Sequence, residues 1–176
     1  MRLALLALLL LVAGCEEPVP DTASSEPKPQ LALLTSLPIA FSEQFGLDVP
    51  PHPLLQRLQR DFDVQPVDGP EQLESGGLLL AVQPHALTAE RLVALDAWVR
   101  GGGRLVLLAD PALTWESSKP LGDVSRPPFS FPDTGLLRHW GLRLDPPREQ
   151  GPAMRRLAGE EVLTASPGTL VREAVS

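Results

Sequence analysis

Apolar residues along this chain occur in two patterns that predict different elements. Short, nearly uninterrupted apolar runs lie at 31–37, 78–82 and 104–109, and such runs are typical of strands buried on both faces of a parallel sheet. Residues 54–62 instead space their apolar side chains three or four positions apart, opposite glutamine and arginine, which predicts an amphipathic helix. Because strands and helices alternate, the pattern predicts an α/β fold with a mainly parallel sheet.

The most complete predicted unit spans residues 77–111. Its strand at 78–82 is followed by a helix that begins after Thr88, a residue type that caps helix N-termini. The glycine run at 101–103 ends this helix, and an apolar strand follows at 104–109. Two such strands joined by a capped helix predict a βαβ unit, which is right-handed in nearly all cases.

The other segments have weaker patterns. Residues 64–67 predict a short strand, and Pro66 within it favours the edge of a sheet. Residues 110–134 are rich in proline and predict a long loop, which in a compact domain is usually functional or disordered. The remaining expected elements are a short helix at 135–140, a strand beginning at 142–144, and a hairpin of 161–165 with 169–175 around the turn 166–168.

The first fifteen residues have the pattern of an export signal. Arg2 precedes an apolar run at 3–13 that reaches only about 16 Å as a helix, too short for a hydrocarbon core of ~30 Å. A basic start, a short apolar centre and small residues at the end predict a cleaved secretory signal. Residues 11–15 (LVAGC) also resemble the bacterial lipobox, which implies cleavage before Cys15 and acylation of that cysteine, including palmitate. An ordinary signal with a stray cysteine is the alternative.

Composition divides the chain into three parts. Residues 1–14 are the predicted signal peptide, residues 15–30 the lipid anchor and a disordered tether rich in proline and acidic residues, and residues 31–176 a single α/β domain. We therefore expect a protein of the cell envelope that is held in the membrane by lipidated Cys15 and faces away from the cytoplasm. Glu16 takes the place of the aspartate that accompanies inner-membrane retention, which favours the outer membrane where there are two.

Charge and cysteine content exclude several functions. The net charge of −7 argues against nucleic acid as a partner, because phosphate backbones attract basic surfaces. The chain has one cysteine, and its lipidation leaves none for a thiolate metal site, a disulfide or a cysteine nucleophile. The three histidines, His52, His85 and His139, lie on different predicted elements without the spacing of metal ligands. We expect no cofactor and no metal.

The best candidate for a ligand site lies where the predicted parallel strands end. Ligands of open α/β sheets bind beyond the carboxyl ends of the strands, and here those ends carry Ser36, His85 and Asp110. Together they offer a hydroxyl, an imidazole and a carboxylate. The alternative is that Asp110, followed by Pro111, only ends a strand and turns the chain.

Trp115, in the proline-rich loop, is a candidate for an interaction site. An indole in such a loop is either folded back onto the core or presented to a partner. If it is presented, we expect an exposed apolar patch along residues 115–131.

Several segments resemble the GldG-type "ABC-type uncharacterised transport system" domain. They are ALTAERLVALDAWVRGGGRLVLLADPAL at 86–113, LTSLPIAFSE at 34–43, PLGDVSRPP at 120–128 and RHWGLRLD at 138–145, in the expected order. Glutamine-amidotransferase-like domains share the strand–helix–GGG–strand part. The resemblance implies a three-layer sandwich, flavodoxin-like or class I amidotransferase-like, without a catalytic triad.

The resemblance also indicates a function. GldG-type proteins accompany the subunits of ABC transporters and are usually held by membrane-spanning helices, for which a lipobox substitutes here. Such domains often continue with another strand past the equivalent of Ser176, so a shortened domain is expected. Amidotransferase activity is excluded, because that reaction needs a cysteine after a central strand.

These observations favour a non-catalytic accessory or interaction module of a membrane assembly, such as an ABC-type transport or gliding-like system. The alternative is a hydrolase or a sugar-binding module that uses Ser36, His85 and Asp110. A third possibility is a purely structural lipoprotein of the envelope.

Overall fold

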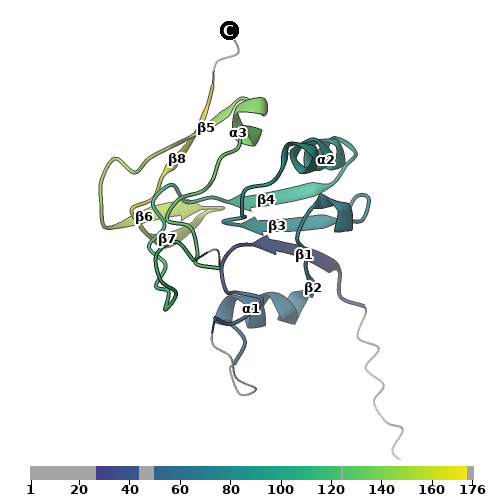
Figure 1. Ribbon diagram of the computed structural model, residues 1–176, viewed down its shortest axis with the longest axis horizontal. Coiled ribbons are helices and arrows are strands. Elements are labelled where there is room, and N and C mark those ends of the chain that lie inside the picture. The colour runs from purple at the N-terminus through teal and green to yellow at the C-terminus, as the bar shows by residue number, and fades with distance from the viewer. Residues whose placement is uncertain (1–26, 44–49, 124, 174–176) are drawn as a thin grey trace, which may run out of the picture.

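A parallel four-stranded sheet forms the centre of the computed structural model, which describes residues 27–43, 50–123 and 125–173 (Figure 1). The strands lie in the order β2-β1-β3-β4 and every neighbouring pair is parallel. They are β1 (Gln30–Thr35), β2 (Asp63–Pro66), β3 (Leu78–Val82) and β4 (Arg104–Leu108). The edge position predicted from Pro66 is confirmed for β2, since a residue without an N–H is tolerated there.

Helices cover both faces of this sheet and make it the middle of three layers. The helix α2 (Ala89–Arg100) packs on one face over Leu79 and Ala81, and α1 (Pro53–Asp61) packs on the other with Leu80 and Val82 (Figure 1). Successive residues of β3 thus belong to different cores, which is why that strand is apolar throughout. The predicted three-layer α/β sandwich is confirmed.

The unit predicted at 77–111 forms as the sequence indicates. The Thr88 side chain accepts a hydrogen bond from the Arg91 backbone N–H at 3.4 Å and caps α2. At the other end, a Cβ atom on Gly103 would lie 2.4 Å from the Trp98 ring. The glycine run therefore both ends the helix and lets the chain pass beneath the indole.

Beyond β4 the chain forms two small antiparallel pairs. Residues 110–134, apart from 124, which is not described, contain no helix or strand, as predicted. The short helix α3 (Leu136–His139) leads into β5 (Leu142–Asp145), which pairs with β8 (Thr169–Arg172). Between them, β6 (Pro152–Leu157) and β7 (Glu160–Ala165) pair with each other and form the ribbon, residues 152–165 (Figure 1).

Strands form where they were predicted at 161–165 and 169–175, as β7 and β8, but the predicted hairpin between them is wrong. The hairpin turn lies earlier, at Ala158 and Gly159, whose φ angles of 50° and 92° are the positive values that tight two-residue turns require. The chain at Gly168 passes so close to Pro111 that a Cβ there would lie 2.4 Å from the proline Cγ. This contact directs the last strand back to β5 and away from β7.

None of the described helices is both long and apolar enough to cross a bilayer. The predicted signal and Cys15 lie outside the described residues.

Candidate functional site

A buried glutamine organises the carboxyl ends of the central strands. Gln83, directly after β3, is 2% exposed and has a φ of 43°. Its Nε2 donates to the Asp110 carbonyl at 3.1 Å, and the Asp110 N–H donates to its Oε1 at 2.8 Å. The side-chain amide thus pairs with the backbone as a neighbouring strand would. It continues the β3–β4 ladder past the point where both strands end.

Ser36 is held by the same glutamine. Its N–H donates to the Gln83 carbonyl at 3.2 Å, and its hydroxyl donates to that same oxygen. The Ser36 proton therefore points at a backbone carbonyl and not at a general base. This arrangement joins the ends of β1 and β3.

Asp110 shapes the turn that follows β4. Its Oδ1 accepts a hydrogen bond from the Ala112 N–H at 2.8 Å, and its carbonyl accepts one from the Phe131 N–H at 2.8 Å. A carboxylate that bonds the N–H two residues ahead is typical of an Asx turn. These bonds match the alternative reading of Asp110, in which it ends a strand and turns the chain.

His85 lies apart from the other two. Its side chain is exposed and borders a small apolar cavity on the α2 face, together with Leu87 and Leu92. In the described part of the chain, no hydrogen bond joins His85 to Ser36 or Asp110. The structure thus brings Ser36 and Asp110 together around Gln83 and leaves the imidazole outside.

Trp115 is folded back against the domain. Its indole is half-buried on the α1 side, and its ring centroid lies 5.6 Å from that of His52. Nearby, Ser117 Oγ donates to Glu43 Oε1 at 2.7 Å, and this bond lowers the pKa of the Glu43 carboxyl. This end of the loop is tied down. Among the described residues of 115–131, Leu121 and Phe129 are the exposed large hydrophobic side chains.

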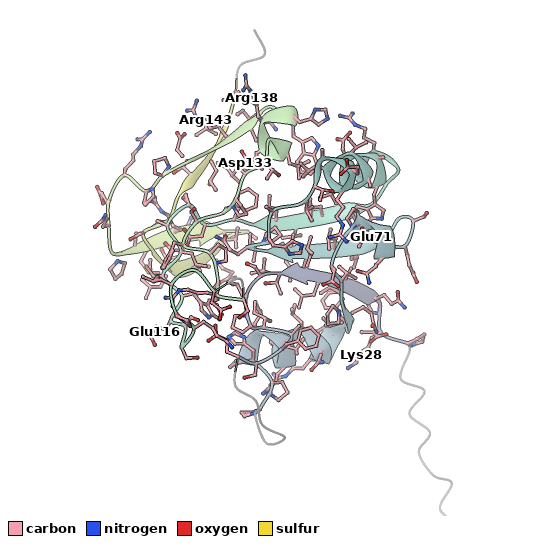
Figure 2. All side chains as sticks on the ribbon, viewed as in Figure 1. Lys28, Glu71, Glu116, Asp133, Arg138 and Arg143 are labelled. Carbon is pink, nitrogen blue, oxygen red and sulfur yellow. The ribbon has the colours of Figure 1, made fainter. Side chains whose placement is uncertain are left out.

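The loop crosses from one layer of the sandwich to the other. Figure 2 shows Glu116 on the side of α1, whereas Asp133 lies on the side of α3. The Leu113 N–H donates to the Phe129 carbonyl at 2.8 Å, so the two limbs of the loop are bonded to each other. The loop therefore closes over the ends of the strands.

Under the loop lies an apolar cleft of about 360 Å³. Its polar wall is Gln83 and Asp110, whose amide and backbone groups bond each other. The remaining lining is almost entirely aliphatic: Leu37, Val82, Leu107, Leu108, Ala109, Leu113, Leu144, Gly168 and Leu170. Such a wall favours apolar groups and offers little to a charged or polyhydroxylated ligand. Within the described residues, no group of three or more histidine, cysteine or acidic side chains is placed to hold a metal ion.

Sequence reasoning placed the site at this edge but overlooked Gln83 as its centre. The available signal was a single polar residue at the end of the fully apolar run 78–82. A buried amide needs partners for both its donor and its acceptor, and the ends of two neighbouring strands provide them.

Comparison with protein families assigns this domain. The family described as "ABC-type uncharacterized transport system" matches residues 28–151, which is more than half of the chain. The chain belongs to this family. The matched segment runs from the approach to β1 through β5, so it holds the whole parallel sheet, and the ribbon and β8 follow it. The family label marks an auxiliary component of an ABC-type transport system. No curated protein and no solved structure matches the chain.

Proposed function

We propose that this protein is a non-catalytic, lipid-anchored accessory module of an ABC-type transport assembly, with a GldG-type, amidotransferase-like domain. The observation that carries the proposal is the family match over residues 28–151, which includes every strand of the central sheet. In this proposal residues 1–14 are removed, 15–30 form the anchor and tether, and 31–176 form the domain that meets the transporter subunits.

The hydrogen bonds at the strand ends support a role without catalysis. A serine nucleophile needs a base within hydrogen-bond reach of its hydroxyl. The Ser36 hydroxyl donates to a backbone carbonyl, and the Asp110 carboxylate accepts from a backbone N–H. Both groups hold the fold in the described structure, and His85 is not bonded to either.

The lipid anchor rests on the sequence alone. The chain's one cysteine follows the apolar run 3–13 and Gly14, where cleavage and acylation are expected. A diacylated, N-acylated cysteine has enough buried methylene groups for stable attachment, whereas a single acyl chain gives only marginal binding. The domain then lies on the side of the membrane that faces away from the cytoplasm, within the reach of a short tether.

Two measurements test these parts separately. Intact-mass analysis of the membrane-extracted protein is expected to show loss of residues 1–14 and the added mass of three acyl chains. A protein that starts at Met1, or that lacks acyl mass, would contradict the anchor. The Cys15→Ala variant is the matched control and is expected to keep its signal and gain no lipid.

Recovery of partners tests the accessory role. The tagged wild-type chain, extracted in mild detergent, is expected to bring down ABC permease or ATPase subunits, and Cys15→Ala to bring down far less. Equal recovery by both forms would leave the domain as the binding element and contradict the need for the anchor. A preparation without any transporter subunit would overturn the accessory role.

A further inference from the structure

We propose that two copies of this chain associate by exchange of the ribbon: β7 of each copy adds as a fifth parallel strand to the open edge of β4 in the other. This inference does not depend on the proposed function. It rests on an unpaired edge, an apolar groove beside it, and an exposed strand of the same chain that fits both.

The outer edge of β4 is unpaired in the described structure. The Arg104 N–H donates to Gly77, and the Leu108 carbonyl accepts from Gln83, so the backbone groups of both residues face β3. Because these groups alternate along a strand, those of Leu105 and Leu107 point away from the sheet. No bond to them is present within residues 27–43, 50–123 and 125–173. An open edge of this kind is a template for another strand.

An apolar groove runs along this edge on both faces of the sheet. On the α2 face, a cavity of about 470 Å³ is bordered by Leu105 and Leu107, and the cleft of about 360 Å³ is bordered by Leu107 and by Leu108, whose side chain lies on the α1 face. Leu170 of β8 borders both cavities. Successive side chains of an added strand would enter the two cavities in turn, since they alternate between faces. The groove therefore fits a strand with apolar residues at consecutive positions.

The ribbon offers such a strand. Its side chains are mostly exposed on both faces, and a two-stranded ribbon without a further partner is only marginally stable. In β7, Val162 and Leu163 are consecutive and point to opposite faces, and Leu163 is 67% exposed. Met154, opposite Leu163 on β6, is also exposed.

Hydrogen bonding fixes which residues of β7 face outward. In a hairpin with a two-residue turn, the residues that flank the turn exchange both bonds. Glu160 is such a residue, and alternation then directs the backbone groups of Glu161, Leu163 and Ala165 away from β6. In a parallel pair, a residue whose N–H and C=O point toward the neighbouring strand bonds to the two residues that flank the residue opposite it. With Leu105 opposite Val162, the backbone groups of Leu105 meet those of Glu161 and Leu163, which point away from β6.

Charge selects the same register. With Leu105 opposite Val162, the exposed Arg104 lies opposite Glu161, and Val106 lies opposite Leu163. Shifting β7 by two residues places Arg104 opposite Gly159 or Leu163 and loses the ion pair. In the proposed dimer the exchange is reciprocal: about a two-fold axis, each copy donates its β7 and accepts that of the other. This complementarity is the reason to assign the groove to a second copy.

Crosslinking between two single-cysteine variants tests the pairing. The full chain with Cys15→Ser has no cysteine, so Val106→Cys and Leu163→Cys, both at exposed positions, can be made in it separately. A short thiol crosslinker is expected to join the two variants when they are mixed, because directly opposite Cβ atoms lie about 5 Å apart. Val93→Cys, on the exposed surface of α2, replaces Val106→Cys in the control mixture and is expected to give no product.

Every other outcome contradicts the proposal. Crosslinking of Val106→Cys with itself would indicate pairing of two β4 edges. Sedimentation of the Cys15→Ser chain as a monomer at about 100 µM, well above a micromolar dissociation constant, would exclude a stable dimer. An equal yield with Val93→Cys would indicate random collision.

A charge exchange tests the register. Arg104→Glu and Glu161→Arg are each expected to weaken dimerisation by roughly tenfold, because like charges then lie opposite each other. The double variant is expected to restore it. If the double variant keeps its circular dichroism but stays as weak as the single variants, the parallel register is wrong.

Discussion

The Asp96 carboxylate joins two helices that are far apart in sequence. Its Oδ1 accepts a hydrogen bond from Trp140 Nε1 at 2.7 Å, and its Oδ2 accepts one from Arg100 Nε at 2.8 Å. His139 Nε2 lies 3.4 Å from Oδ1. Asp96 belongs to α2, whereas Trp140 ends α3, so this carboxylate attaches the short helix to the layer above the sheet.

This junction makes stability depend on acid pH. The hydrogen bond from Arg100, then that from Trp140, lowers the pKa of Asp96 from 3.8 to about 2. A carboxyl whose pKa is lower in the folded state stabilises the fold above its unfolded pKa and loses this contribution as pH falls through the folded one. The melting temperature of the wild type is therefore expected to fall more steeply between pH 4 and pH 2 than that of Asp96→Asn.

The control for this measurement is Asp61→Asn, at the exposed end of α1. Its pH profile is expected to follow that of the wild type. Parallel curves for the wild type and Asp96→Asn would show that the carboxylate adds no pH-dependent stability.

Gln83 provides the second prediction. Gln83→Ala leaves the Asp110 N–H and carbonyl without their partners, and a lost pair of buried bonds costs about 2–4 kcal/mol of unfolding free energy. The φ of 43° is unfavourable for glutamine and alanine alike, whereas glycine adopts it freely, so Gln83→Gly loses the amide but also relieves the backbone. Urea denaturation of Gln83→Ala and Gln83→Gly separates the two effects. Wild-type stability in Gln83→Ala would show that the amide adds nothing to stability, and the gain of Gln83→Gly over Gln83→Ala measures the backbone strain.

The sequence predicted the parallel core because burial dictates its pattern. A strand such as β3, covered on both faces, must be apolar at consecutive positions, and α2 must present an apolar stripe between a cap and a glycine stop. These requirements act on neighbouring residues, so short stretches of the sequence show them.

The strands β7 and β8 were predicted, but β6 and the pairing of the last three strands were not, because the same requirement does not act on them. The ribbon is exposed on both faces, so Arg155 and Arg156 stand beside Met154 without any alternation. The pairing of β8 with β5 joins residues 24 to 30 positions apart, as in Asp145 with Thr169 and Leu142 with Arg172. It depends on the approach of Gly168 to Pro111, which no local pattern records. Gln83 was overlooked for the same reason, since its partners lie 27 residues away.

Gly168→Ala tests the approach that places β8. The new Cβ would lie 2.4 Å from Pro111 Cγ and 2.8 Å from the Asp145 carbonyl oxygen, and relieving such overpacking costs about 1–3 kcal/mol. Pro111→Ala removes the nearest atoms and is expected to recover part of the loss in the double variant. Additive losses in a urea-denaturation cycle would show that the two residues do not touch.

His85→Ala separates the two functions that the sequence allowed. The side chain is exposed and has no hydrogen bond to Ser36 or Asp110, so its removal is expected to change the unfolding free energy by less than about 0.5 kcal/mol. If the protein is an accessory module, His85→Ala is expected to recover transporter subunits to the same extent as the wild type. Ser36→Ala is the comparison, because it removes a bond to the Gln83 carbonyl and is expected to cost about 1 kcal/mol while partner recovery persists. If His85→Ala instead abolished function in cells and left stability intact, the imidazole would have a chemical role, and the hydrolase or sugar-binding alternative would replace the accessory one.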